Sequence, residues 1–161
     1  MFKPRTADGK AIIFTSNRAG EEYNRVYKQF LSGDTPKVID TGSIGYGFDE
    51  PRVSPDGKWV VGISYPKSGG SSETAELMRV PITGGSPELV FPVARGVSGS
   101  CARSSPSNLC AVAEVTEDHK RLTITSFDPV KGRGPELARF DLDRMEATRS
   151  ARSLQTAHAW L

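Results

Sequence analysis

The sequence is poor in the residues that most catalytic and metal sites require. Its 161 residues include two histidines, His119 and His158, and two cysteines, Cys101 and Cys110. The cysteines are too far apart for a thioredoxin-type C-x-x-C, and with only two histidines in the chain we expect no zinc set around them. The hydrolase elbow G-x-S-x-G is also absent, because the nearest string, GVSGS at 96–100, lacks the last glycine. We therefore expect no enzyme activity, no cofactor and no metal site.

Long apolar runs and blocks of one charge are missing as well. No run approaches the roughly 20 apolar residues that cross a bilayer, and the opening MFKPRTADGK lacks the apolar centre of a signal peptide. The net charge of +2 comes from 21 basic and 19 acidic residues scattered along the chain. Such scatter offers no basic arm for a nucleic acid. We expect neither a nucleic-acid partner nor a membrane segment within these residues.

What the chain has is an internal repeat, with 16 glycines and 11 prolines to punctuate it. TADGKAIIF at 6–14 aligns with SPDGKWVVG at 54–62, and SPSNLCAVA at 105–113 is a weaker third copy. A second landmark, a turn followed by Pro and an apolar segment, recurs at 33–39, 84–90 and 132–138. A period of roughly 40 to 50 residues is typical of propeller blades.

Within the middle unit the pattern predicts strands at 50–53, 59–64, 76–81 and 88–91, with a Pro-Asp-Gly turn between the first two. The second of these, WVVGIS, is apolar almost throughout, as expected of a strand packed between neighbouring sheets. The fold class predicted is all-β, a partial β-propeller of about three four-stranded antiparallel blades. We expect an incomplete first blade at 1–49, further blades at 50–97 and 98–141, and an irregular or short helical tail at 142–161.

The SPDGK string at 54–58 and the SNRAG string at 16–20 resemble TolB-like, WD-related propeller repeats of bacteria, and the resemblance covers about residues 5–141. Propellers of this family close with six or more blades, so three blades would form part of a ring. The same repeat occurs in a periplasmic partner-binding protein, in prolyl-oligopeptidase-type peptidases and in bacterial sensors. The resemblance implies a noncatalytic scaffold that binds a protein or peptide through its blade loops. The alternative is the accessory propeller of such a serine peptidase, with its hydrolase domain outside this chain.

Candidate binding residues lie in and after the SNRAG string. Asn17, Arg18, Tyr23 and Arg25 combine basic and aromatic side chains that could meet a partner, although an exposed loop and an outward strand face would also explain them. Open blade ends could in addition pair two copies of the chain into a homo-oligomer.

Two outcomes remain open for the cysteines that flank the turn at 104–108. Cys101 and Cys110 either form a disulfide, which would need Cα atoms about 4.4 to 6.8 Å apart, or remain two buried thiols. A bridge would indicate a periplasmic or other extracytoplasmic location, and reduced thiols would indicate the cytoplasm.

Overall fold

The structure is a computed structural model that describes residues 4–18, 20, 23–40, 47–65, 74–94, 97–102, 109–116 and 118–142. Within these ranges the regular structure is a series of β-strands. The strands are β1 Ala11–Ser16, β2 Arg25–Phe30, β3 Lys37–Val38, β4 Phe48–Val53, β5 Trp59–Ser64, β6 Thr74–Pro81, β7 Glu88–Ala94, β8 Ser98–Cys101, β9 Cys110–Val115, β10 Arg121–Asp128 and β11 Gly132–Asp141.

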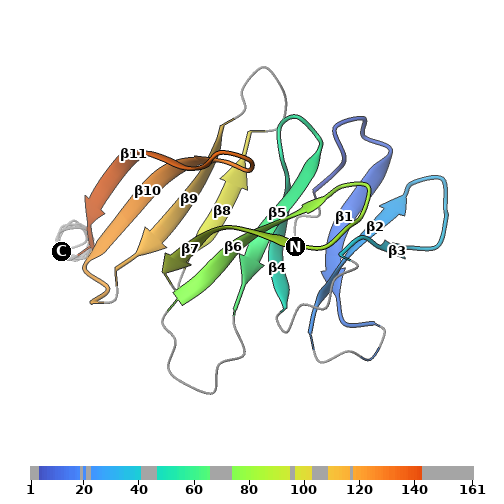
Figure 1. Ribbon diagram of the computed structural model, residues 1–161, viewed down its shortest axis with the longest axis horizontal. Helices are drawn as coiled ribbons and strands as arrows, with labels where there is room; N and C mark the ends of the chain where they lie inside the picture. The colour runs from blue at the N-terminus through green and yellow to red at the C-terminus, as the bar shows by residue number, and fades with distance from the viewer. Residues whose placement is uncertain are drawn as a thin grey trace, which may run out of the picture.

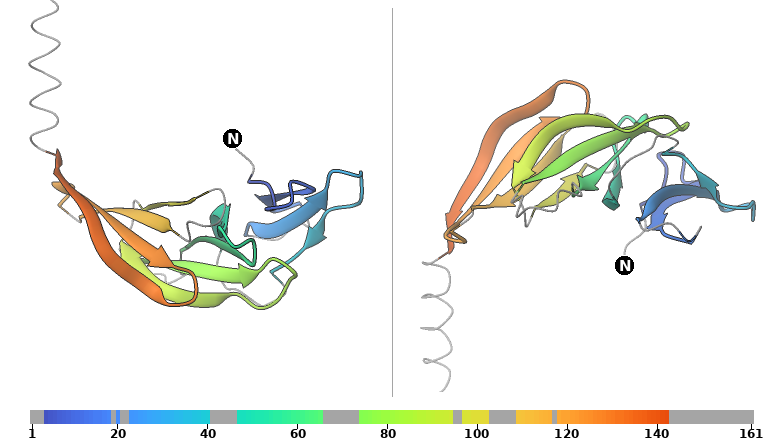
Figure 2. Two further views of the ribbon diagram at one scale, coloured as in Figure 1. Left: turned by 90° about the horizontal axis from the view of Figure 1, so that it is seen from above. Right: turned by 60° about the horizontal axis from the view of Figure 1, so that its bottom comes forward.

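The strands form three antiparallel sheets that follow one another along the chain. Their orders are β1-β2-β3, β4-β5-β6-β7 and β8-β9-β10-β11, so each sheet pairs strands that are neighbours in sequence. Figure 1 shows the sheets side by side, and Figure 2 shows that they are arranged in an arc. This radial succession of meandering sheets is the construction of a β-propeller. The predicted fold class, a partial all-β propeller, is confirmed.

The first sheet lacks a full inner strand in the described residues. Arg5 forms an isolated antiparallel bridge with Ile12, and the main-chain oxygen of Pro4 accepts a hydrogen bond of 2.8 Å from Ile13. Pro4 and Arg5 therefore stand beside β1 as β4 stands beside β5. The proposed blade limits stay predictions; β4 begins two residues before the expected boundary at 50.

The core lies between the sheets, and β5 contributes to both of its halves. Val60 belongs to a buried cluster with Ile13 and Val26 of the first sheet. Val61 and Ile63 belong to a second cluster that includes residues of the third sheet, among them Val112 and Phe127. Successive side chains of a strand point to opposite faces, so a strand covered on both sides must be apolar on both. The unbroken apolar run of β5 has this cause.

The turn between β4 and β5 has a hydrogen-bond pattern that recurs elsewhere in the chain. The carboxylate of Asp56 accepts a hydrogen bond of 2.6 Å from Ser54 Oγ and one of 3.1 Å from the Lys58 amide, while Gly57 takes a φ of +71°. Residues 6–10 form the same turn with Thr and Asp in these roles. In the weaker copy predicted at 105–113, positions 105–108 lie outside the described residues, and the apolar segment after them forms the start of β9.

The same turn occurs at a third place that the repeat did not indicate. Between β9 and β10, Asp118 accepts hydrogen bonds from Thr116 Oγ1 at 2.6 Å and from the Lys120 amide at 3.0 Å. Here His119 occupies the position of the glycine, with a φ of +55°. A non-glycine residue in this left-handed region carries a steric cost.

The predicted strands of the middle unit all form, and three of them are longer than expected. β5 has the predicted limits, β4 and β6 begin two residues earlier, and β7 continues to Ala94. The tail at 143–161 lies outside the described residues. In the part of the chain that the structure describes, no helix has the length and apolar character needed to cross a membrane.

Candidate binding pocket

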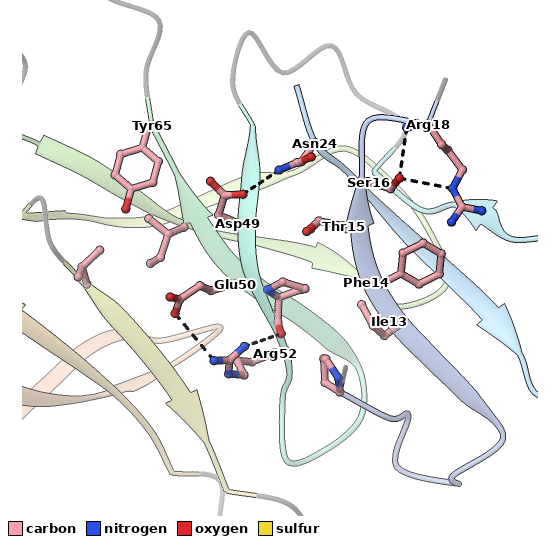
Figure 3. A pocket seen from close by; sticks show the side chains of 14 residues that line it. Ile13, Phe14, Thr15, Ser16, Arg18, Asn24, Asp49, Glu50, Arg52 and Tyr65 are labelled. Atoms are coloured by element: carbon pink, nitrogen blue, oxygen red, sulfur yellow. Dashed lines mark hydrogen bonds and ion pairs between the residues drawn. The ribbon is translucent and has the colours of Figure 1, made fainter. Parts of the chain in front are cut away.

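A pocket of about 690 Å³ lies where β1, β4 and the start of β8 come together. Residues of all three sheets, or next to them, therefore contribute to its lining. Its lining is half apolar and half polar. The residues are Pro4, Ile13, Phe14, Pro51, Ile63, Tyr65 and Val97, with Thr15, Ser16, Arg18, Asn24, Asp49, Glu50 and Arg52. Figure 3 shows Asp49 and Glu50 on β4 and Thr15 on β1 beside this space, with Arg18 beyond β1 on the side of Phe14.

Asp49 supplies one acidic group of the pocket, and Asn24 orients it. Asn24 precedes β2 in the first sheet, and its Nδ2 donates a hydrogen bond of 3.1 Å to Asp49 Oδ1 on β4 (Figure 3). The main chains join at the same point, because the Phe48 amide donates to the Asn24 oxygen at 3.1 Å. The carboxylate is therefore held in a fixed position between two sheets.

Glu50 supplies a second acidic group, and an irregularity in β4 directs it. The register between β4 and β5 shifts between Asp49 and Arg52, and Glu50 has a φ of +49°. A β-bulge bends a strand and redirects a side chain, and a positive φ at a non-glycine residue persists only where its surroundings hold it. Here Ser98 Oγ donates a hydrogen bond of 3.2 Å to Glu50 Oε2, and Arg52 Nη2 lies 3.8 Å from the same oxygen. The bulge thus links the second sheet to the third.

Arg18 forms a cationic edge of the pocket. Its guanidinium carbon lies 4.8 Å from the ring centre of Phe14 and 5.1 Å from that of Tyr27, and the two rings stack with centroids 5.6 Å apart. Ser16 Oγ accepts hydrogen bonds from the Arg18 amide at 3.2 Å and from its Nε at 3.5 Å. The aromatic faces attract the cation, so the guanidinium is positioned although the residue is exposed.

The four predicted binding residues are separated by the structure. Arg18 lines the pocket, and Asn17 is exposed beside it; Tyr23 and Arg25 are partly buried and do not line the pocket. Arg25 instead pairs with Asp40, with Nε and Oδ2 3.1 Å apart, and its Nη2 donates to the Asp40 main-chain oxygen. Contact of any of the four with a partner stays a prediction.

Asp40 explains why Arg25 is held in this way. Its side chain is fully buried, and the loss of water raises the pKa of its carboxyl, against the opposing effects of a main-chain hydrogen bond with Val26 and of the Arg25 guanidinium. Oδ1 of Asp40 has no hydrogen-bond partner among the described residues. Removing the cation from a buried ion pair leaves an uncompensated charge and destabilises the fold. Arg25 therefore stabilises this sheet by pairing with Asp40.

Sequence reasoning missed Asn24, Asp49, Glu50 and Arg52. A signal was present, because the predicted strand at 50–53, EPRV, contains two charges and a proline, and Asp49 comes directly before it. Within sheets, proline is confined to edge strands and bulges. The innermost strand of a blade is an edge strand, so a proline there is compatible with a strand. What the string could not reveal is the partner of each charge, since Asn24 and Ser98 come from other sheets.

Cys101 and Cys110 face each other directly in the β8–β9 pairing, with their sulfurs 2.04 Å apart. The neighbouring Ala102 amide donates to the Leu109 oxygen, so the cysteines occupy a non-hydrogen-bonded pair, the position at which opposing Cα atoms come closest. Their Cα atoms are 3.9 Å apart, closer than the expected range. Bridging of the two cysteines in the natural protein stays a prediction.

Comparisons with known proteins identify the fold. No protein-family model matches the chain, and no curated protein sequence matches it. Among solved structures, TolB from Acinetobacter baumannii is 20% identical with a TM-score of 0.59, over 85% of this chain and 33% of TolB. The putative TolB from Agrobacterium tumefaciens is 21% identical with a TM-score of 0.61, over 84% of this chain and 44% of that protein. The chain thus spans between a third and a half of these structures, and over most of its length it has the TolB-like β-propeller fold.

Proposed function

We propose that this chain is a noncatalytic β-propeller scaffold that binds a protein or peptide partner in the pocket between β1, β4 and β8. The observation that carries this proposal is the lining: two carboxylates and two guanidiniums stand among apolar walls in one space of about 690 Å³. Ligand pockets commonly have volumes of about 300 to 1,000 Å³ and few, well-placed polar groups.

The chemistry of the lining suits a peptide. Asp49 and Glu50 can accept hydrogen bonds from main-chain amides or from a basic side chain, and Arg18 can donate to a carbonyl or carboxylate. Ile13, Ile63 and Val97 offer apolar contact between these groups. A peptide presents amides, carbonyls and apolar side chains along one extended segment, which matches this alternation.

The polar groups are also positioned before a ligand arrives. Asp49 is oriented by Asn24, Glu50 by Ser98 and Arg18 by two stacked rings. Groups held in this way lose little freedom on binding, which favours affinity. Rigid sheets that present variable groups at their ends are the usual basis of binding on propellers.

The comparisons support only the scaffold, because this chain spans less than half of each TolB structure. Partner binding by the whole protein is therefore part of the proposal, as is a location outside the cytoplasm, which the bonded sulfurs support. The peptidase-accessory alternative and a homo-oligomer stay predictions.

The test is selection of binders from a random peptide library displayed on phage, followed by calorimetry of the selected peptides. We expect Arg18→Ala and Asp49→Ala to weaken binding by about tenfold or more. Arg139→Ala is the matched control, because Arg139 is exposed on β11 and pairs with Glu136 three residues before it. Circular dichroism must show that all variants are folded. Failure to select any peptide, or peptides insensitive to both pocket variants, would contradict the proposal.

A further inference from the structure

One wall of the pocket depends on a very short strand. β8 has four residues, lies at the inner edge of the third sheet and pairs with β9 alone. By comparison, β4 has six residues and β1 has six. Edge strands with few pairs are the parts of a sheet that open most readily.

The start of β8 makes the contacts that matter for the pocket. Val97, the residue before it, is 7% exposed, packs in the cluster of Val112 and Phe127 and lines the pocket. Ser98 donates the 3.2 Å hydrogen bond to Glu50. The packing of Val97 and the hydrogen bond of Ser98 to Glu50 both depend on the pairing of β8 with β9.

The end of β8 is held by the cysteines. Cys101 closes β8, and its sulfur is bonded to that of Cys110, the first residue of β9. Cys110 is 1% exposed and belongs to the same core cluster as Val97, whereas Cys101 is only partly buried. The bond therefore ties an edge strand to a strand that is anchored in the core.

We propose that the Cys101–Cys110 bond is a redox-sensitive clamp on the pocket wall. With the bond intact, β8 holds Val97 and Ser98 against the second sheet; when it is reduced, β8 separates from β9 more often and the third-sheet side of the pocket opens. The loosening of β8 stands on the strand geometry alone. The consequence, weaker partner binding, rests on the proposed function of the pocket.

The switch needs a thiol reductant, and a dithiol suffices. One thiolate of the dithiol attacks Sγ of Cys101, the less buried of the two residues, the S–S bond breaks, and Cys110 leaves as a thiolate that takes up a proton. The second thiolate of the reductant then displaces Cys101, which is protonated in turn. The bridge gains two electrons and two protons, and the reductant becomes a disulfide.

Hydrogen exchange of the whole chain, oxidised and then reduced with dithiothreitol, tests the clamp. We expect the amides of β8 to exchange about tenfold or more faster after reduction, with β5 unchanged. The double variant Cys101→Ser/Cys110→Ala is the control and should exchange fast with and without reductant. An unchanged rate in β8, equal acceleration of β5, or free thiols in the untreated protein would each overturn the clamp.

The affinity of a phage-selected peptide separates the two proposals. If the clamp controls the pocket, reduction weakens binding to the wild type but not to the double variant. Faster exchange of β8 with unchanged affinity would overturn the link to binding, while the loss caused by Arg18→Ala would still support the pocket. If no peptide is selected, the proposed function fails and the exchange rates still decide on the clamp.

Discussion

The guanidinium of Arg79 on β6 donates a hydrogen bond of 2.6 Å to the main-chain oxygen of Pro129, just after β10 in the neighbouring sheet. The same side chain lies 4.4 Å from the ring centre of Trp59 and forms an ion pair of 2.6 Å with Glu88. One cation thus joins the second and third sheets outside the apolar core.

A second arginine makes the reverse connection. Arg133 on β11 donates a hydrogen bond of 3.0 Å to the main-chain oxygen of Pro92 on β7, and its guanidinium lies 4.5 Å from the ring centre of Phe91. Glu114 pairs with it and also accepts a hydrogen bond from the Ala94 amide at 3.1 Å. Each sheet therefore sends one arginine to a proline carbonyl of the other.

Arg79→Ala should lower the free energy of unfolding by about 2 kcal/mol, because it removes a charged hydrogen bond and leaves a carbonyl between sheets without its donor. Arg79→Lys keeps the charge but cannot bond Pro129, bond Glu88 and stack on Trp59 together, so it should restore less than half. Urea denaturation measures both. Arg139→Ala removes an exposed ion pair and should change the free energy of unfolding little. Equal losses in Arg79→Ala and Arg139→Ala would refute the link between the sheets.

Gly62→Ala should destabilise the chain by about 1 to 3 kcal/mol through overpacking. A Cβ at Gly62 would overlap the fully buried Phe48 ring and stand 2.8 Å from the Asp49 oxygen. Gly99→Ala, also in a strand, meets nothing within 4 Å and should shift the thermal midpoint little. A Gly62→Ala midpoint as high as that of Gly99→Ala would show that this packing is looser than described.

His119→Gly should raise the free energy of unfolding by about 0.5 to 1 kcal/mol. The left-handed φ costs histidine about 1 to 2 kcal/mol, part of which the flexibility of glycine in the unfolded chain offsets. The reverse exchange, Gly9→His, places histidine at a φ of +69° in the same turn with no neighbour within 4 Å of its Cβ, and should destabilise by a similar amount. Guanidinium denaturation measures the free energy of unfolding of both variants. Changes of the same sign in His119→Gly and Gly9→His would contradict this prediction.

Three carboxyls should titrate in a definite order. Hydrogen bonds from the Thr6 hydroxyl and the Lys10 amide lower the pKa of Asp8, and those from Thr116 and Lys120 lower the pKa of Asp118. Burial raises the pKa of Asp40. Carbon-detected NMR of the carboxyls should therefore show Asp40 protonating first as the pH falls. Asp40 titrating below either exposed acid would contradict this order.

The same shifts give the pH dependence of stability. A carboxyl whose pKa is lowered by folding stabilises the fold above its ordinary value of 3.8, and this contribution is lost as the pH falls below it. The raised pKa of Asp40 acts in the opposite sense, because its ionisation at higher pH costs the folded state free energy. The variant Asp8→Asn/Asp118→Asn should accordingly lose stability less steeply below about pH 4 than the wild type. Urea denaturation at a series of pH values measures this dependence. A free energy of unfolding that falls equally steeply with pH in the variant and in the wild type would contradict the prediction.

Much of the fold was predictable because its signals are local. The Pro-Asp-Gly turn after Ser54 closes through hydrogen bonds within five residues, and the apolar run from Trp59 to Ser64 reports that β5 is covered on both faces. The turn at Thr116 has the same Thr and Asp roles, but its likeness to these turns was missed because His119 replaces the glycine that marks the other copies.

By itself, the sequence determined where strands and turns form, since hydrophobic period and turn chemistry act between residues close along the chain. Tertiary structure alone decided the pocket. Asn24 meets Asp49 across 25 residues and Ser98 meets Glu50 across 48, and these contacts exist only because the sheets pack face to face around a shared core. Which charge finds which partner depends on how the sheets are placed, and that placement is a property of the packed molecule rather than of any segment.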